Sequence, residues 1–407
     1  MGTYCLTYTF DQIIVREGTQ SLKFDAKKAT FGTDDVMPMW VADMDFAVPN
    51  AISLALKARL NHPIYGYSIA PDSLYAALIE WLRDRHHWQV EREWIVLTPG
   101  VVPSLNLVVA ALTNEHDGVI VQPPVYFPFF SAVTNQNRQL IENPLVLTCG
   151  DDGKLHYEMD FAQLDDCAKN AKMLMLCTPH NPVGRVWQKE ELLKLLAIAK
   201  EHNLIVLADE IHADLVFKNV QHFSLSCLAD NIHNTSQIKH EHLIVTAVSP
   251  SKTFNIPGLG LSALIVPNET HRQAIQTKIN HMGVSVTNPF NMAAFEAAYR
   301  EGGDWLEALM PYLQNTVDAA IKYIQDNIPF IKVIPPQGTY LLWLDCRELK
   351  LDDSALNRFF IQEAKLGLSP GAIFGKGGEG FMRMNIGTTQ ANVIAALTRL
   401  KIALTSY

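Results

Sequence analysis

Between about residues 50 and 285, short runs of apolar residues alternate with stretches of helical periodicity. Residues 204–208 carry no polar side chain, so they predict a strand buried on both faces of a sheet. Just before them, residues 190–201 place leucines at helical spacing and predict an amphipathic helix. Strands that alternate with helices predict an α/β fold, with a mostly parallel sheet covered by helices on both faces. The other expected strands of this sheet are residues 94–97, 118–121, 172–177 and 243–248.

After about residue 290 the pattern changes. Helical stretches, at residues 289–299 and 305–326, are followed by strand candidates at residues 331–334, 340–344 and 380–385. Helices followed by a run of strands predict a second, smaller α+β domain.

The chain has 407 residues, a length that favours two to three domains. We expect residues 51–288 to form the large domain and residues 289–407 the small one. Residues 1–50 are expected to be an N-terminal segment that joins the small domain.

The charge balance limits the partners. The sequence has 33 Lys and Arg against 42 Asp and Glu, a net charge of −9, and no basic run. This balance argues against binding to nucleic acid or to an anionic membrane surface. A small anionic molecule is still allowed, because it needs only a local site.

The six cysteines are scattered, without a Cys-x-x-Cys pair. In a chain of this length they indicate reduced thiols rather than disulfides or a zinc site, and no metal is expected. The N-terminal residues show no signal peptide, and no apolar run reaches about 18 residues, so we expect a cytoplasmic protein that does not span a membrane.

A lysine stands directly after the expected strand 243–248. Lys252 lies between two small hydroxyl residues, Ser251 and Thr253. Burial and nearby cations lower the pKa of such an amine and free its lone pair for a Schiff base. The alternative is an ordinary loop lysine in a polar turn.

Three more segments follow strands, and in sheets of this kind ligands bind outside the carboxyl ends of the strands. Residues 98–104 form a glycine turn that opens a helix, which is a candidate phosphate cradle. Tyr126, in a proline-rich loop, could stack on a planar ring or pack into the core. Asn181 could hydrogen-bond a phenolate oxygen, although Asn-Pro is also a common turn signal.

The strand at residues 204–208 ends at Asp209. A carboxylate there is costly unless it is paired with a cation or a hydrogen-bond donor, and a protonated pyridine nitrogen would serve. His212 follows three residues later. It is more typical of a structural histidine or a second hydrogen bond than of a metal ligand, since no other ligand stands at suitable spacing.

In this order, the segments resemble pyridoxal-5′-phosphate (PLP) enzymes of the class I/II aminotransferase superfamily, also called fold type I. The resemblance covers nearly the whole chain, and the residues of its motifs are most similar to those of the MalY/PatB-type C–S lyases. The strings that carry it include MWVADMDF at residues 39–46, YGY at 65–67, HNPVGRVW at 180–187, DEIHAD at 209–214 and SPSKTFNIPGL at 249–259.

The resemblance implies PLP as the cofactor and gives each motif a role. Lys252 would be the Schiff-base lysine, and Asp209 would pair with the pyridinium nitrogen. Tyr126 would stack on the ring, Asn181 would bond the ring hydroxyl, and His212 would lie beside the cofactor.

The same resemblance implies the phosphate and substrate contacts. The phosphate would be held by the Val101 and Val102 amides, Ser249 and Ser251. Tyr65 would reach it from the neighbouring subunit, which implies a homodimer with shared active sites. Arg383 would bind the substrate carboxylate bidentately, with Tyr340 and Trp40 also at the substrate. Residues 258–261 stand where many relatives carry a phosphate-binding arginine, so none is assigned.

The implied activity is β-elimination from cystathionine or a related cysteine S-conjugate, which gives a thiol, pyruvate and ammonia. An aminotransferase is the alternative, because it would use the same residues up to loss of the Cα proton. A non-catalytic regulator that keeps the fold is the third hypothesis. The presence of Lys252, Asp209 and Arg383 together argues against lost activity.

Overall fold

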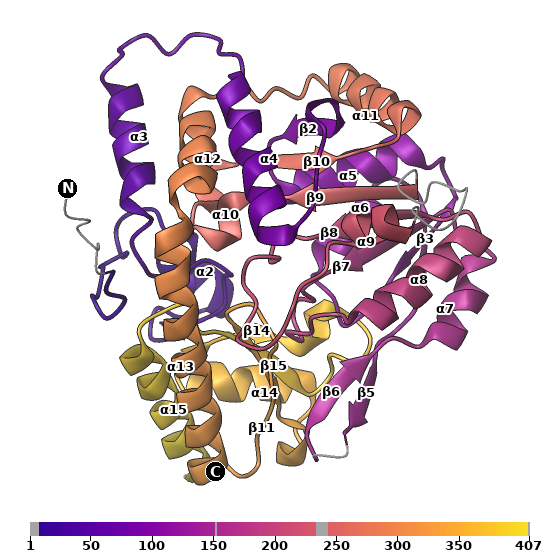
Figure 1. Cartoon of the computed structure of the whole chain (residues 1–407). Coiled ribbons are helices and arrows are strands. Elements are labelled where there is room, and N and C mark those ends of the chain that lie inside the picture. The colour runs from indigo at the N-terminus through magenta and orange to yellow at the C-terminus, as the bar shows by residue number, and fades with distance from the viewer. Residues whose placement is uncertain (1–7, 151–152, 233–242, 406–407) are drawn as a thin grey trace.

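The computed structural model describes residues 8–150, 153–232 and 243–405, and Cys5 and the N-terminal residues 1–7 lie outside this part. Within it, seven strands form a central sheet in which β10 alone runs antiparallel to its neighbours (Figure 1). The predicted α/β fold with a mostly parallel sheet is therefore confirmed. Across the sheet, the order is β2 (Ile95–Thr98), β10 (Ser262–Ile265), β9 (Ile244–Val248), β8 (Ile205–Asp209), β7 (Met173–Cys177), β3 (Gly118–Val121) and β4 (Gln139–Glu142).

Helices cover both faces of this sheet, because successive side chains of a strand point to opposite faces. In β7, Met173 and Met175 belong to one apolar cluster, and Leu174 and Leu176 belong to another. The first cluster includes side chains of α5 (Val101–Leu112), α6 (Pro128–Thr134) and α11 (Glu269–His281). The second includes side chains of α7 (Phe161–Ala168), α8 (Lys189–Glu201) and α9 (Leu225–Ile232).

A second, antiparallel sheet lies at the other end of the molecule (Figure 1). Its strands are β11 (Lys332–Ile334), β12 (Leu341–Asp345), β15 (Phe381–Asn385) and β14 (Ser369–Pro370). Near it lie α14 (Asp353–Arg358), α15 (Gln390–Thr405) and one half of the long helix α13 (Gly303–Asn327), while a hairpin joins β5 (Val146–Cys149) to β6 (Leu155–Glu158). Three further helices are α3 (Asn50–Leu60), α4 (Asp72–His86) and α12 (Pro289–Glu301), and the four-residue α10 (Pro250–Thr253) follows β9.

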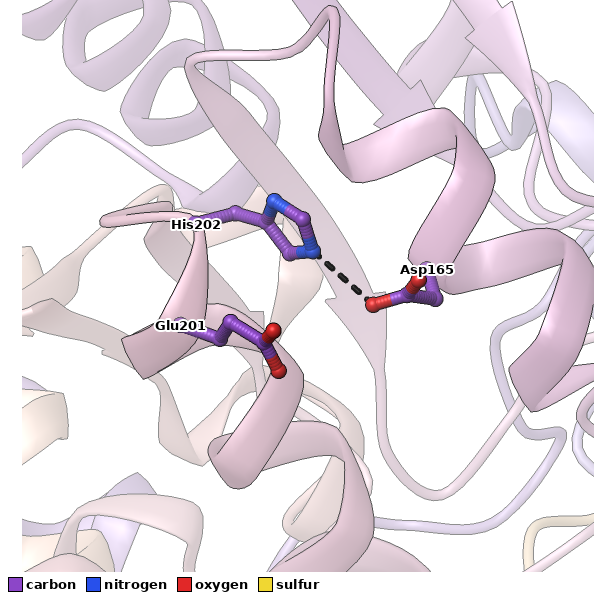
Figure 2. Close-up of side chains that lie close together, drawn as sticks. All are labelled: Asp165, Glu201 and His202. Carbon is purple, nitrogen blue, oxygen red and sulfur yellow. Dashed lines mark hydrogen bonds and ion pairs between the residues drawn. The ribbon is translucent and has the colours of Figure 1, made fainter.

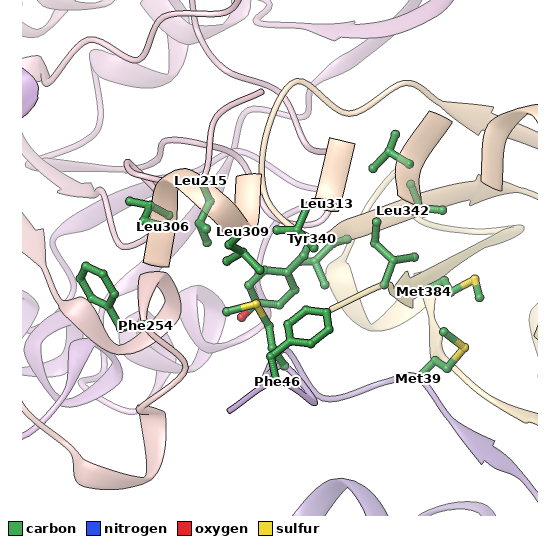
Figure 3. Close-up of a cluster of buried hydrophobic side chains, with 14 of the residues drawn as sticks. Met39, Phe46, Leu215, Phe254, Leu306, Leu309, Leu313, Tyr340, Leu342 and Met384 are labelled. Atoms are coloured by element: carbon green, nitrogen blue, oxygen red, sulfur yellow. The ribbon is translucent and has the colours of Figure 1, made fainter. Parts of the chain in front are cut away.

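The segment before residue 50 pairs with the C-terminal part of the chain. Strand β1 (Met37–Pro38) runs parallel to β13 (Leu366–Gly367), after the short helices α1 (Leu22–Asp25) and α2 (Lys27–Phe31). Figure 3 shows Met39 and Phe46 in one buried apolar cluster with Tyr340, Met384 and leucines of α13. These contacts agree with an N-terminal segment that joins the small domain, although the residue boundaries of the domains stay a prediction.

The helix after β2 differs from the expectation. The sequence pattern predicted a helix over residues 104–112, whereas α5 begins at Val101. The physical reason is that a proline is tolerated in the first turn of a helix, where its missing N–H would have no helical acceptor, so Pro103 does not delay the start. No helix in the described ranges is long and apolar enough to cross a membrane.

Candidate active site

The loops after several strands meet at one cavity of about 260 Å³. It lies where ligands are expected in a doubly wound sheet, outside the carboxyl ends of the parallel strands. Nine of the residues singled out from the sequence line it: Val101, Val102, Tyr126, Asn181, Asp209, His212, Ser249, Ser251 and Lys252. A larger, more open cavity of about 840 Å³ lies beside α4 and α9, and none of these nine residues is in its wall.

Lys252 projects from α10 into the cavity. Its Nζ donates a hydrogen bond to the carbonyl oxygen of Ala42 at 2.7 Å. Burial lowers the pKa of this amine to about 8, and the charge of Arg383 acts in the same direction, whereas Asp43 and Asp209 oppose the change. A lysine with such a pKa can supply a neutral, nucleophilic amine near neutral pH.

Asp209 ends β8 with its carboxyl group buried. Burial raises its pKa to about 7, although the backbone N–H of Ile211 donates to Oδ1 at 3.1 Å and the charge of Lys252 also lowers it. His212 lies nearby, and burial lowers its pKa to about 3, so its ring is neutral at pH 7. Its buried Nδ1 has no hydrogen-bond partner among the described residues. A ligand with a protonated ring nitrogen would satisfy the Asp209 carboxylate.

The N-terminus of α5 faces the same cavity. The first two residues, Val101 and Val102, have backbone N–H groups that no helical carbonyl can accept, and the third, Pro103, has no N–H. Gly100 precedes them with φ of +134°, a conformation that favours glycine. Together with the positive end of the helix dipole, these amides suit a phosphate group.

The two serines differ in their availability. The Ser249 hydroxyl donates to the Leu261 carbonyl oxygen at 2.9 Å and accepts from the Ser251 amide. The Ser251 hydroxyl makes no hydrogen bond within the described part of the chain. Ser251 is therefore the one that can turn its hydroxyl to an anion without losing an internal bond.

Arg383, on β15, is 4% exposed, and its hydrogen-bond partners within the residues that the structure describes include no carboxylate. Its guanidinium donates to Asn181 Oδ1 at 3.0 Å, to the Trp40 carbonyl oxygen at 2.8 Å and to Ser369 Oγ at 3.3 Å. Its buried Nε has no hydrogen-bond partner in the described part of the chain. Burial lowers the pKa of this group to about 10, and it remains cationic at pH 7. A buried cation without a counter-ion fits an anionic ligand such as a carboxylate.

Tyr340 is a buried aromatic residue near these groups, and Tyr126 is a partly buried one. Tyr126 lines the cavity, where burial raises the pKa of its hydroxyl. Tyr340 donates its hydroxyl to the Ala42 carbonyl oxygen at 2.9 Å, the same atom that accepts from Lys252. The two side chains are thus placed beside the reactive amine, where a planar ligand and its substrate would lie.

Trp40 and Tyr65 are placed differently. Trp40 contributes its backbone carbonyl to Arg383, while its indole N–H donates to the Lys23 carbonyl oxygen at 3.1 Å. Tyr65 lies outside the cavity of its own chain: it is 54% exposed, and its hydroxyl donates to the Leu60 carbonyl oxygen at 3.3 Å. Within one chain the structure does not bring Tyr65 to the other predicted residues.

The motif-based reading of the sequence missed residues that hold the cavity together. We call residues 40–46 the strap, because this segment crosses the site between Lys252 and Arg383. Asn255 accepts from the Met44 amide at 2.9 Å and donates to the Met44 and Phe46 carbonyls at 2.9 and 2.8 Å. Asn385 donates to the carbonyl oxygens of Val41 and Asp43. Asn255 stands three residues after Lys252, and Asn385 stands two residues after Arg383. This closeness in sequence is the signal from which both could have been predicted.

One group of three possible metal ligands occurs among the described residues, and it lies elsewhere. Figure 2 shows Asp165 on α7 beside Glu201 and His202 at the end of α8. His202 Nε2 already bonds Asp165 Oδ1 at 2.8 Å, so this pair ties the two helices together. None of the three residues lines the Lys252 cavity.

Known proteins resemble this chain over nearly its whole length. Residues 34–400 match the family model for aminotransferase class I and II. The chain is 40% identical to cystathionine beta-lyase PatB of Bacillus subtilis, over 97% of this chain and 99% of that protein. It is 30% identical to protein MalY of Escherichia coli, over 95% and 96%.

Among solved structures, cystalysin from Treponema denticola, which contains PLP, superposes with a TM-score of 0.92 at 34% identity, covering 98% of this chain and 100% of that one. These alignments cover almost every residue of the chain, in sequence and in structure, and the family model matches most of it. The chain belongs to the class I and II aminotransferase family.

Proposed function

We propose that the protein is a PLP-dependent carbon–sulfur β-lyase, which cleaves cystathionine or a related cysteine S-conjugate to a thiol, pyruvate and ammonia. The observation that carries the proposal is one cavity in which a buried lysine amine, a buried carboxyl group and a helix N-terminus converge, with a buried arginine close by. The full-length similarity to a cystathionine beta-lyase supports the choice of reaction.

The residues present fit PLP. The free Val101 and Val102 amides and the Ser251 hydroxyl would hold its phosphate, and Asp209 would keep a proton on its ring nitrogen. Tyr126 would lie against the ring, and Asn181 would bond its hydroxyl. When bound, PLP supplies an electrophilic carbonyl for the amino group of the substrate and a ring that accepts electrons.

The chain's own residues then bind the substrate and move its proton. Arg383 would bind the α-carboxylate through two parallel hydrogen bonds, which fixes the Cα–H bond in direction. Lys252 Nζ, with its pKa lowered to about 8, would remove the Cα proton as a general base. A thiolate is a good leaving group and departs from Cβ, and the remaining enamine hydrolyses to pyruvate and ammonia.

Two further features of the working enzyme are proposals of the same kind. Tyr65, which lies outside its own cavity, would complete the phosphate site of a second copy in a homodimer. A cytoplasmic location is supported by the five cysteines in the described part of the chain, which form no disulfide bond.

The Lys252→Ala variant tests the proposal. We expect it to keep the fold and to lose β-lyase turnover by at least ~10²–10⁴-fold, because general-base catalysis alone contributes that much. Pyruvate release from cystathionine measures the turnover, and circular dichroism checks the fold. A variant that retains more than about a tenth of wild-type turnover would contradict the role of Lys252.

A second measurement separates the lyase from an aminotransferase. The wild-type enzyme should release pyruvate and thiol from cystathionine without any added keto acid. If activity instead requires a keto acid and moves the amino group to it, the lyase proposal is wrong and the transferase takes its place.

A further inference from the structure

The residue after Lys252 points away from the cavity. Thr253 is fully buried, and its hydroxyl donates to Asp214 Oδ2 at 2.8 Å. Lys252 and Thr253 are neighbours on α10, so the hydrogen bond of one constrains the direction of the other. This contact connects the reactive lysine to the loop that follows β8.

Asp214 is a buried carboxylate on which side chains of α4 also converge. Its Oδ1 accepts from Trp81 Nε1 at 3.1 Å and His86 Nε2 at 2.8 Å, and Arg85 Nε lies 3.5 Å away. Burial opposes ionisation of this carboxyl group, but the hydrogen bonds from His86 and Thr253 and the charge of Arg85 keep its pKa below the usual value. Asp214 therefore stays negatively charged and acts as a fixed acceptor.

The helix that carries Lys252 needs such an anchor. With four residues, α10 is too short to be stable alone, and its orientation depends on contacts with the rest of the molecule. A hydrogen bond from a hydroxyl to a carboxylate is directional and stronger than one between neutral groups. An apolar contact of the same size would fill the space without fixing the rotation of α10.

We propose that Asp214 is a positioning residue, which through Thr253 holds α10 so that the Lys252 amine points to the cofactor cavity. Asp214 itself does not line the cavity that contains Lys252. The proposal rests on the proposed function only in taking Lys252 as the reacting amine.

The competing explanation is that the Asp214 network only stabilises the fold, by joining α4 to the loop after β8. Removing Asp214 would not distinguish the two, because the donors of Trp81, His86 and Thr253 would all lose their acceptor. The better change is Thr253→Val, which keeps the size of the side chain and leaves the contacts of Trp81, Arg85 and His86 with Asp214 in place. Thr253→Ser, which retains the hydroxyl, is the rescue variant.

Thr246→Val is the matched control. Thr246 is a buried threonine on β9, the strand that leads to α10, and its hydroxyl bonds Ser226 Oγ at 2.8 Å. The substitution makes the same chemical change without touching Asp214. Both valine variants should lose thermal stability, and Thr253→Val should lose more, because its missing hydrogen bond is to a carboxylate.

Steady-state kinetics of pyruvate release from the holoenzyme give the first readout. Thr253→Val should lower kcat by about 10- to 100-fold, since a misplacement near 1 Å can cost that much, while KM changes less than about twofold because Arg383 is untouched. Thr253→Ser and Thr246→Val should keep kcat within about threefold of wild type. Equal kcat in wild type and Thr253→Val, or an equal loss in both valine variants, would overturn the proposal.

The second readout does not depend on lyase activity. In the cofactor-free chain, an amine-selective acylating reagent should label Lys252 several times faster in Thr253→Val than in wild type, as measured by peptide mass mapping. Unchanged labelling of exposed lysines serves as the internal control. If the wild-type enzyme releases no pyruvate but this difference is present, the positioning role stands and the proposed activity fails; equal labelling of Lys252 removes the positioning role whatever the activity is.

Discussion

At the scale of single residues, the site groups destabilise the chain that carries them. Burial raises the pKa of Asp209 to about 7 in the folded chain, from an ordinary value near 3.8, so its ionised form is disfavoured there. Lys252 has a pKa of about 8 against 10.5, so its charged form is disfavoured as well. Each difference corresponds to roughly 3–4 kcal/mol of lost stability when the group is charged. Ionisable side chains at these two buried positions lower the stability of the chain. Their presence therefore favours a role for Asp209 and Lys252 in binding rather than in stability.

The Asp209→Asn variant should show how much stability the chain loses when the buried Asp209 carboxyl ionises. Because the folded pKa of Asp209 is raised, its contribution to stability is complete below pH 3.8 and is lost as the pH rises through about 7. The cofactor-free variant should therefore be more stable than wild type by up to ~4 kcal/mol at pH 8, and by less than half of that at pH 5. The lowered pKa values of His180 and His212 give the opposite slope, but they do so in both proteins.

Urea unfolding of both proteins at pH 5 and pH 8 measures this difference. Asp34→Asn, which changes an exposed carboxylate, is the control. It should leave the free energy of unfolding unchanged at both pH values. A difference between Asp209→Asn and wild type that is the same at the two pH values would show that the Asp209 carboxyl is not the titrating group.

At the scale of elements, the strap is the part of the site that depends on backbone atoms. Its Ala42 carbonyl accepts from both Lys252 and Tyr340, and its Trp40 carbonyl accepts from Arg383. One asparagine from each side of the cavity, Asn255 and Asn385, fixes it through further carbonyl and amide groups. The strap is therefore held by the same short segments that carry the lysine and the arginine.

Asn255→Gly should loosen the strap selectively. Asn255 has φ of +57°, which glycine adopts without strain, so the change removes three hydrogen bonds and little else. We expect the free energy of unfolding to fall by ~1–3 kcal/mol and the Met44 amide to exchange its hydrogen faster. Asn219→Gly, at an exposed asparagine with φ of +68°, is the matched control. Unchanged exchange at Met44 would show that the strap is held without Asn255.

The elements differ in how far the sequence could predict them. Strands β7, β8 and β9 were expected to within one residue, because uninterrupted apolar runs identify strands buried on both faces. Strand β4 lies at the sheet edge with exposed and partly exposed residues, and so lacks this signal. The contacts of the strap could not be predicted either, since they are made by backbone carbonyls, which look alike in any sequence. Asp214 and Thr253 are 39 residues apart, and only the folded chain shows that they meet.

At the scale of the whole molecule, the loop between α3 and α4 is unusual in its exposed apolar side chains. Ile64, Tyr65, Tyr67 and Ile69 are 66%, 54%, 101% and 90% exposed, and Figure 1 places this loop at one end of the molecule, away from the small sheet. A contiguous exposed apolar segment of this kind is typical of an interaction surface. We propose a second copy of the chain as the partner, because its cavity would receive Tyr65 and the contact would cover the exposed loop.

Mixed dimers test whether the site is shared. In a hybrid of a Tyr65→Phe chain and a Lys252→Ala chain, a crossing loop gives one site with both native residues, whereas a loop confined to its own subunit gives none. We therefore expect activity per Lys252-bearing site to recover to the wild-type value in the hybrid, from a measurable defect in the Tyr65→Phe homodimer. Sedimentation of differently tagged chains confirms that hybrids form. The two loop arrangements contain the same residues and differ only in which chain supplies Tyr65 to a site. If the hybrid does not recover, or if the Tyr65→Phe homodimer has no defect, the Tyr65 hydroxyl does not act across the interface.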